Sequence, residues 1–381
     1  MERFDVTVVG ARAAGAATAM LLARRGLRVL LLDRDRYGRD TLSTHALMRG
    51  AVLLLGRWRV LDRIVDKATP PIRRATFHYG GPVPETSTVS FKPALGVDSL
   101  YAPRRTVLDP ALVDAAAEAG AEVRFGVTAT GLIRDRAGRV TGVTGHDQQG
   151  TEFRVSCALT VGADGAKSMV ARETGAQVIA RGSASGAFIY GYWADLPIGG
   201  YEWSYRPGGS AGLIPTNDGR VCAFVGLPSH RFPAELADGL PAAYRRLLPA
   251  LAWNFADRLA EATPPGRLWA TPGRIGFARE TSGPGWALVG DAGSFIDPIS
   301  THGITDALRD AALLANWFDD PSGYAGARDR IALPMLGLAD AIARYDWDIT
   351  QLRRYLLELS SRMSEEVELL ASLRDDMAVA P

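Results

Sequence analysis

Two histidines of this chain lie in copies of one tripeptide, Ser-Thr-His. The first copy is Ser43-Thr44-His45 and the second is Ser300-Thr301-His302. Histidine titrates near neutral pH, so it is well suited to giving or taking a proton during catalysis. We therefore expect His45 and His302 to be the catalytic candidates. In the simpler alternative, each imidazole bonds a backbone carbonyl and only orders its loop.

The first copy follows a segment with the pattern of a nucleotide-binding unit. Residues 4–35 read FDVTVVGARAAGAATAMLLARRGLRVLLLDRD, which predicts a buried strand over 4–9, a helix over 13–25 and a second strand over 27–32. Glycines at the turn let the helix N-terminus approach a pyrophosphate, and an acid about 20 residues later can bond a ribose. The candidate contacts to a dinucleotide cofactor are Gly10, Arg12, Ala13, Ala14, Gly15, Asp33 and Arg34.

The turn departs from the G-x-G-x-x-G pattern at one position. Arg12 stands where the middle glycine normally lets the pyrophosphate come close to the backbone. An arginine can serve there only if its Cβ points away, with the guanidinium reaching a phosphate or the adenine. A purely structural β-α-β unit is the alternative.

Three later segments carry further patterns of acids and glycines. Residues 103–135 contain Arg105, with Arg104 as its competitor, before Leu-Asp and an alanine-rich helix. Residues 155–175 contain A-D-G-x-x-S-x-V-A-R, and residues 285–315 contain G-D-A, then D-P, then a glycine that opens a helix. In this order, the segments resemble the class A flavoprotein monooxygenases of the para-hydroxybenzoate hydroxylase type, over roughly residues 3–330. Geranylgeranyl reductases and flavin-dependent halogenases share this layout.

The resemblance implies an α/β fold, in which a Rossmann-like FAD-binding domain carries an inserted antiparallel β-sheet substrate domain and C-terminal helices. It implies that Asp291 bonds a ribityl hydroxyl of FAD, and that both Ser-Thr-His loops approach the cofactor from different sides. The helix that opens at Gly303 would direct its positive end toward the reduced flavin. The positions that it assigns to cofactor contacts are Thr44, Arg105, Asp164, Gly165, Gly290, Asp291, Pro298, Thr301, Gly303 and Ile304.

The domains are expected to be discontinuous. The FAD-binding domain takes residues 1–75, 101–179 and 276–330, the substrate domain takes 76–100 and 180–275, and a helical segment takes 331–381. Short aromatic and β-branched runs between turn residues predict an antiparallel sheet in the substrate domain. Alternation places aromatic side chains on one face, which either lines a substrate pocket or belongs to the core. The candidate substrate residues are Tyr190, Tyr192, Trp203, Tyr205 and Arg206, with Phe188 on the same face.

The chemistry implied by the resemblance is the transfer of an oxygen atom to an electron-rich carbon through a flavin C4a-hydroperoxide. We expect an FAD-dependent monooxygenase that hydroxylates an aromatic or polycyclic small molecule, with NADPH or NADH as reductant. A flavin-dependent alkene reductase of the prenyl or geranylgeranyl type is the main alternative, although DTLSTH replaces the cysteine-containing segment of those reductases. A halogenase is disfavoured because Ser210 and Gly212 stand at the tryptophan positions of its motif. A flavin-binding scaffold or ligand sensor is the non-enzymatic alternative.

Composition limits the partners and the location. The formal net charge is +1, so no broad electrostatic field favours nucleic acid or an anionic membrane. No apolar run approaches the roughly 20 residues that span a bilayer. Cys157 and Cys222 lie in apolar, strand-like contexts that are typical of buried thiols. We expect a cytoplasmic protein with a small-molecule substrate and no metal, while the oligomeric state and a covalent flavin link stay open.

Overall fold

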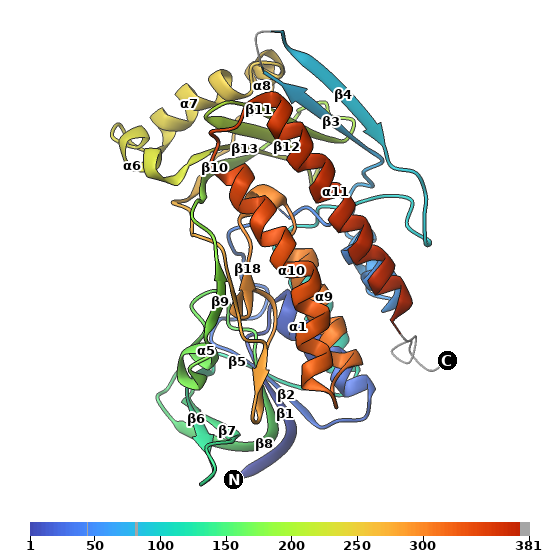
Figure 1. Ribbon diagram of the computed structural model, residues 1–381, viewed down its shortest axis with the longest axis vertical. Helices are drawn as coiled ribbons and strands as arrows, with labels where there is room; N and C mark the ends of the chain where they lie inside the picture. Colours follow the sequence, from blue (N-terminus) through green and yellow to red (C-terminus); the bar gives the residue numbers. More distant parts are fainter. Residues whose placement is uncertain (44, 81–82, 374–381) are drawn as a thin grey trace.

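The computed structural model describes residues 1–43, 45–80 and 83–373, and two large sheets lie at its opposite ends (Figure 1). The first sheet contains the N-terminal strand and has eight strands, whereas the second has seven. A three-stranded sheet lies between them, in the order β18 (Ser294–Phe295), β15 (Phe277–Arg279), β9 (Val178–Arg181). The α/β class with a Rossmann-like first part, predicted from the sequence, is confirmed.

The first sheet is built around parallel strands in the order β17, β8, β1, β2, β5. All residues of β2 are buried, as expected for a parallel strand that is covered on both faces. The helix α1 packs against both α4 and α9 on one side of this sheet. The elements are β1 (Glu2–Val9), α1 (Ala13–Arg24), β2 (Val29–Asp33), α4 (Arg105–Glu118), β5 (Glu122–Phe125), β6 (Thr128–Arg134), β7 (Val140–His146), β8 (Glu152–Gly162), α5 (Met169–Thr174), β16 (Ser282–Gly283), β17 (Trp286–Leu288) and α9 (Gly303–Asn316).

The second sheet has the order β14, β10, β13, β12, β11, β3, β4. Its neighbouring strands are antiparallel except β3 and β11, which run parallel. This pair joins strands that are far apart in the sequence, so no hairpin fixes their direction. The elements are β3 (Arg74–Tyr79), β4 (Glu85–Ser90), β10 (Gly186–Trp193), β11 (Tyr201–Arg206), β12 (Gly209–Pro215), β13 (Val221–Pro228), η1 (Ser229–Arg231), α6 (Phe232–Glu235), α7 (Leu240–Leu251), α8 (Ala256–Glu261) and β14 (Leu268–Thr271).

The second sheet has two different faces. Along β10, Ala187 and Ile189 belong to an apolar cluster that includes residues of α7 and α8. Phe188, Tyr190 and Tyr192 alternate with them and belong instead to the large core shared with the first sheet. The aromatic face of the second sheet is therefore turned toward the first sheet.

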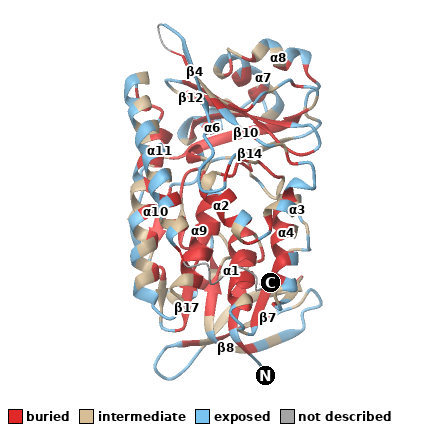
Figure 2. Ribbon diagram, turned by 90° about the vertical axis from the view of Figure 1, so that its right-hand side faces the viewer, coloured by how far each residue is buried: buried red, intermediate tan, exposed pale blue. Residues whose placement is uncertain are grey.

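Long helices join the two halves. The helix α10 (Pro321–Ala343) runs from the first sheet toward the second, and α11 (Ile349–Ser372) returns beside the second sheet (Figure 1). The helix α11 packs against α2 (Arg49–Arg57), which precedes α3 (Leu61–Val65). Arg57 donates to the carbonyls of Leu370 and Ala371, each at 2.8 Å. Figure 2 shows that α1 and α9 are buried along most of their length, whereas α11 exposes one side. None of the described helices is long and apolar enough to cross a membrane.

Candidate active site

The turn after β1 depends on two glycines. Gly10 has a φ of +105°, and a Cβ there would lie 2.4 Å from the carbonyl oxygen of Ala163. A Cβ on Gly15 would lie 1.7 Å from the carbonyl oxygen of Gly10. The first turn of α1 holds no acidic residue and its N-cap has no side-chain hydrogen bond. The backbone N–H groups at this helix end therefore suit an anionic group such as a phosphate.

Arg12, at the position of the missing glycine, extends sideways from the turn. Its guanidinium lies 3.1 Å from the carboxylate of Asp35 and 3.5 Å from that of Asp109. Arg12, Asp33 and Asp35 line a small cavity beside the end of β2. Asp33 itself accepts hydrogen bonds from the backbone N–H groups of Ala11 and Asp35, each at 2.7 Å. The acid thus fixes the turn and also borders the cavity where a ribose is expected.

The remaining predicted residues of this turn and of the second acidic motif have distinct surroundings. Ala13 and Ala14 are buried in the first turn of α1, whereas Arg34 is exposed. Asp164 accepts a 2.6 Å bond from the backbone N–H of Met169, and burial raises the pKa of this carboxyl. Its other oxygen has no partner among the described residues. Gly165 has a φ of +79° and no neighbour within 4 Å of a built Cβ, so the backbone there is open to a ligand.

Gly290 and Asp291 form the short turn η2 (Gly290–Ala292) at the end of β17. A Cβ on Gly290 would lie 2.9 Å from the Cβ of Ala14, so glycine lets this turn approach the start of α1. The Asp291 side chain is exposed to solvent, although many protein atoms surround it. The partial loss of solvent raises its pKa to about 6, and the negative charges of Asp306 and Asp310 also raise it. Asp291 is therefore a carboxyl group that is poised to share protons or hydrogen bonds with a ligand.

Arg104 and Arg105 lie side by side at the start of α4 but turn to different partners. Arg105 donates two bonds of 2.9 Å to the carboxylate of Asp109. Arg104 pairs with Asp40 at 3.2 Å and lies 3.8 Å from the ring centroid of Tyr192. Arg105 thus belongs to the nucleotide end of the molecule, and Arg104 belongs to the aromatic face.

The second Ser-Thr-His segment meets the aromatic face across a narrow crevice. Pro298 and Thr301, in and beside η3 (Pro298–Ser300), line this crevice together with Trp203 and Tyr205. The crevice holds only about 10 Å³, and its other lining residues are Phe188, Ser210, Ala211, Phe224 and Ile299. Thr301 adopts a left-handed conformation with φ +57°. Gly303 follows at the open N-terminus of α9, where no atom lies within 4 Å of a built Cβ, and Ile304 is partly buried.

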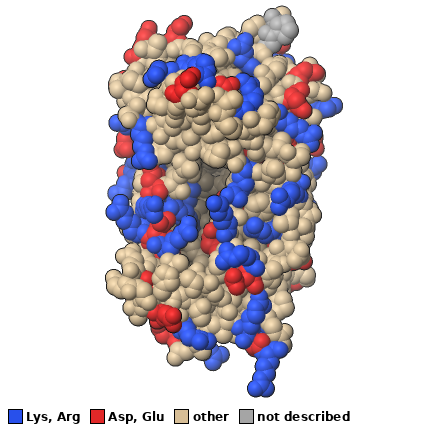
Figure 3. Space-filling model, turned by 90° about the vertical axis from the view of Figure 1, so that its left-hand side faces the viewer, with Lys and Arg blue, Asp and Glu red and all other residues tan. Residues whose placement is uncertain are grey.

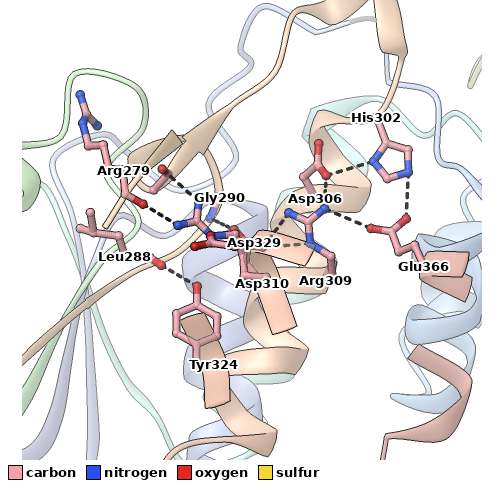
Figure 4. A network of polar contacts seen from close by, with 12 residues as sticks. Arg279, Leu288, Gly290, His302, Asp306, Arg309, Asp310, Tyr324, Asp329 and Glu366 are labelled. Carbon is pink, nitrogen blue, oxygen red and sulfur yellow. Dashed lines mark hydrogen bonds and ion pairs between the residues drawn. The ribbon is translucent and has the colours of Figure 1, made fainter. Parts of the chain in front are cut away.

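His302 points away from that crevice into a buried network of charges (Figure 4). Its Nδ1 lies 3.1 Å from Asp306, and its Nε2 lies 2.9 Å from Glu366 as an ion pair without the angle of a hydrogen bond. Burial disfavours the charged ring, but Glu366 and Asp306 outweigh burial and raise the pKa of His302 to about 10. His302 thus contacts two carboxylates in place of the backbone carbonyl of the simpler alternative, and these contacts hold its loop to α9 and α11.

The same three side chains could face a metal ion, since their ligand atoms lie within 4.8 Å of one another. However, the buried guanidinium of Arg309 already bonds Asp306 and lies 3.2 Å from Glu366. A cation placed between these carboxylates would lie close to the Arg309 charge. Protonated His302 and Arg309 already pair with Asp306 and Glu366, and Arg309 also pairs with Asp310 at 2.8 Å, so we interpret the cluster as a salt-bridge network.

His45, in the first copy, has the opposite environment. It is buried, has a φ of +70°, and its Nε2 contacts the hydroxyl of Tyr192. Burial, together with the charges of Arg104 and Arg105, lowers the pKa of His45 well below its usual value. Its Nδ1 has no partner among the described residues. The neighbouring Thr44, a predicted cofactor contact, lies outside the residues that the structure describes.

The predicted substrate residues fall into two groups. Tyr190 accepts a 3.2 Å bond from the backbone N–H of Ser43 and stacks on Trp269 with ring centroids 5.7 Å apart, so it touches the first Ser-Thr-His segment. Arg206, in contrast, is exposed and donates to the carbonyl of Ala250 at 2.8 Å. Arg206 lines none of the cavities described here, because at the end of β11 its side chain turns toward α7.

Comparison with known proteins identifies the family of the chain. Residues 3–319 match the family described as the FAD binding domain. The chain belongs to this family. Menaquinone reductase of Mycobacterium tuberculosis is 30% identical over 335 residues, which cover 83% of this chain and 76% of that protein. Aklavinone 12-hydroxylase DnrF of Streptomyces peucetius is 34% identical over 230 residues, which cover 53% of this chain and 44% of that protein. The predicted class of FAD-dependent oxidoreductase is confirmed.

Solved structures share the fold at low sequence identity. PqsL of P. aeruginosa in complex with 2-aminobenzoylacetate has a TM-score of 0.79 at 20% identity, over 94% of this chain and all (100%) of that chain. The flavin-dependent brominase Bmp2 has a TM-score of 0.77 at 19% identity, over 97% of this chain and 93% of that chain. At these identities the likeness shows the fold alone.

The residues of the nucleotide end fit FAD chemically. The glycine turn and the free N–H groups of α1 suit the pyrophosphate, and Asp33 suits a ribose. Asp291 lies where η2 approaches the start of α1, and it suits a hydroxyl of the ribityl chain. Figure 3 shows a hollow in the molecule between the two sheets, with basic side chains on both sides of it. A cofactor carrying two phosphates is favoured by such surroundings.

Sequence reasoning missed several residues around this site. Phe224 lines the crevice, and its signal was the alternation Cys222, Phe224 along β13, which matches the aromatic face. Trp269 of β14 packs on both Tyr190 and Tyr192, but an isolated tryptophan in a short run gives no specific signal. Glu366 lies far along the chain in α11, where helical spacing predicts packing and nothing indicates the contact with His302.

Proposed function

We propose that this protein is an FAD-dependent monooxygenase that hydroxylates a compact aromatic molecule, with NADPH or NADH as reductant. The observation that carries the proposal is the aromatic face of the second sheet, which lies across a narrow crevice from Pro298 and Thr301. Aromatic walls favour a planar substrate, because rings stack at small separations. Bound FAD would supply the activation of oxygen, and the protein's own residues bind, orient and exclude water.

The cofactor is held from three directions in this proposal. The turn at Gly10 and the start of α1 receive the phosphates, Asp33 receives a ribose, and Asp291 receives a hydroxyl of the flavin's side chain. The loop from Pro298 to Thr301 would lie along the flavin ring. Hydroxylation needs the substrate carbon held within reach of the flavin, and the aromatic face that borders this loop is the surface that the fold provides for it.

His45 and Tyr192 form the pair best placed to handle a proton. Tyr192 keeps its proton near neutral pH, because burial raises its pKa far above the usual value. It therefore donates to Nε2 of His45, and Nδ1 of the neutral imidazole carries the other proton. That N–H group is buried and can donate to a carbonyl or phenolate oxygen of a ligand.

A turnover experiment tests the proposal. Purified protein loaded with FAD is supplied with NADPH or NADH and a panel of phenols and aromatic carboxylates, under air and under nitrogen. The expected result is a product that gains one oxygen atom from isotopically labelled oxygen, with no product in the anaerobic sample. Reduced nicotinamide consumed without oxygen incorporation for every compound in the panel counts against hydroxylation.

Reduction of a carbon–carbon double bond is the second candidate. It is favoured by relatives named as reductases that align over most of the chain. Menaquinone reductase covers 83% of this chain, and the digeranylgeranylglycerophospholipid reductase of Methanocella arvoryzae, which is 28% identical, also covers 83% of it. Anaerobic saturation of an isoprenoid alkene, with no dependence on oxygen, would establish the reductase and displace the hydroxylase.

A further inference from the structure

A pocket at the edge of the aromatic face is lined by arginines. Arg104 at the start of α4, Arg220 in the turn between β12 and β13, and Arg267 before β14 come together around it. The rings of Tyr192 and Trp269 form its apolar walls, and the segment Pro265–Gly266 closes it. The pocket holds about 150 Å³, against about 10 Å³ for the crevice beside Thr301. It is thus the roomier of the two spaces that adjoin the aromatic face.

The charge of this pocket is not balanced by the described residues. Asp40 pairs with Arg104 at 3.2 Å, but neither Arg220 nor Arg267 forms an ion pair or side-chain hydrogen bond with any residue in the described ranges. The Nε of Arg104 is buried and also has no partner there. Arg220 and Arg267 are exposed to solvent, which screens their mutual repulsion, but an anion that enters the cavity would still meet three cationic side chains.

The aromatic walls add a preference for a flat ligand. Arg104 lies 3.8 Å from the ring centroid of Tyr192, and Arg267 lies 5.3 Å from that of Trp269. These contacts hold each guanidinium group over a ring. The N–H groups at the outer edge of the guanidinium can then bond a carboxylate. A cavity of roughly 150 Å³ accommodates a ring of the size of benzene.

The pocket also has a direct connection to the proposed catalytic pair. Tyr192 lines the pocket, and its hydroxyl contacts Nε2 of His45. A ring bound in the pocket beside Trp269 would therefore have its charged end at Arg220 and Arg267 and lie close to the first Ser-Thr-His segment. We propose, building on the function above, that the arginine pocket binds the carboxylate of an aromatic substrate.

Binding of a matched pair of probes to the FAD-loaded protein tests this assignment without turnover. Benzoate and benzamide have nearly the same shape and differ in charge, and their affinities are measured by titration calorimetry. We expect benzoate to bind at least tenfold more tightly than benzamide. Arg220→Gln and Arg267→Gln should each weaken benzoate binding by about three- to tenfold, and the double variant by more, with benzamide unchanged.

The control is Arg245→Gln on α7, on the opposite side of the sheet, where an exposed arginine is lost without touching the pocket. It should leave both affinities unchanged. Equal affinities for the two probes, or a double variant that binds benzoate like the parent protein, would overturn the assignment. So would inorganic phosphate that displaces benzoate at equal concentration, since the pocket would then recognise anions without regard to the ring.

Failure of the proposed function gives a different pattern. If arginine-dependent benzoate binding is observed and no compound in the turnover panel gains oxygen, the carboxylate site is supported and the proposed hydroxylation is contradicted. If oxygen is incorporated but the arginine variants bind and turn over the substrates like the parent, hydroxylation stands and the pocket falls.

Discussion

The two Ser-Thr-His segments place one kind of side chain in opposite electrostatic surroundings. His45 is buried beside a phenol and near Arg104, and its pKa is lowered. His302 is buried between the carboxylates of Asp306 and Glu366, and its pKa is raised to about 10. At neutral pH the first imidazole is therefore neutral and the second is charged.

The difference originates in remote parts of the chain. Arg104 opens α4, whereas Glu366 belongs to α11 near the C-terminus. An identical tripeptide thus acquires its chemistry from whichever helix packs against it. A neutral histidine with a free N–H can serve a ligand, while a histidine held between two acids can fix a loop. Variants that remove each imidazole in turn test whether the two histidines have these different roles.

The largest effect is expected on stability at the second segment. His302→Leu leaves Asp306 and Glu366 buried with Arg309 as their remaining cation, so the free energy of unfolding should fall by about 3–5 kcal/mol. Urea unfolding of the FAD-saturated protein at pH 7 measures it. His302→Leu combined with Glu366→Leu should recover part of the loss, because it removes one of the carboxylates that Arg309 alone cannot neutralise. A loss below about 1 kcal/mol, typical of exposed ion pairs, would mean that the network is unimportant.

The pH dependence of stability separates the two histidines next. The raised pKa of His302 contributes stability that is fully present below pH 6.5 and is lost as the pH rises through about 10. The lowered pKa of His45 acts in the other direction, so its contribution is lost as the pH falls below its ordinary value. The stability difference between the parent and His302→Leu should therefore shrink on the alkaline side, in denaturation curves recorded from pH 6 to 10. A difference that is constant with pH would contradict the charged state of His302.

Much of the nucleotide end could be predicted because its signals are local. The β-α-β segment, Gly10, Gly15 and Asp33 lie within one stretch of chain. A glycine in the sequence directly marks a position, such as Gly10, where the backbone can adopt a conformation that other residues avoid. The alternation along β10 similarly predicted that Phe188, Tyr190 and Tyr192 share a face. Both inferences rest on backbone geometry that neighbouring residues determine.

Contacts between distant segments could not be read in the same way. Nothing in the sequence of α11 indicates that Glu366 meets His302, or that the β12–β13 turn brings Arg220 to Arg104. The direction of β3 beside β11 is likewise set by the path of the chain through the first domain. Arg206 illustrates the same point, because adjacency to Tyr205 suggested a pocket residue and the strand end turned it outward.

At the first segment the expected effect is on turnover. His45→Gln removes the imidazole whose buried Nδ1 has no hydrogen-bond partner among the described residues, and the rate of hydroxylation should fall by about a hundredfold. FAD should still bind with parent-like affinity, measured by flavin fluorescence, because the phosphate-binding turn is untouched. The loss of unfolding free energy should be smaller than for His302→Leu. Parent-like turnover in His45→Gln would place His45 with His302 as a residue that only orders its loop.

The smallest effect is expected from the partner of His45. Tyr192→Phe keeps the ring under Arg104 but removes the hydroxyl that contacts Nε2 of His45. Without that donor the imidazole is free to carry its single proton on either nitrogen, so the form with a proton on Nδ1 is populated only in part. The kcat for hydroxylation should therefore fall by about tenfold while KM stays near the parent value, which is the pattern for an interaction made only in the transition state. Steady-state kinetics with the best substrate of the panel measures both constants. An increase in KM alone would show instead that Tyr192 serves as a wall of the pocket and does not determine which nitrogen of His45 carries the proton.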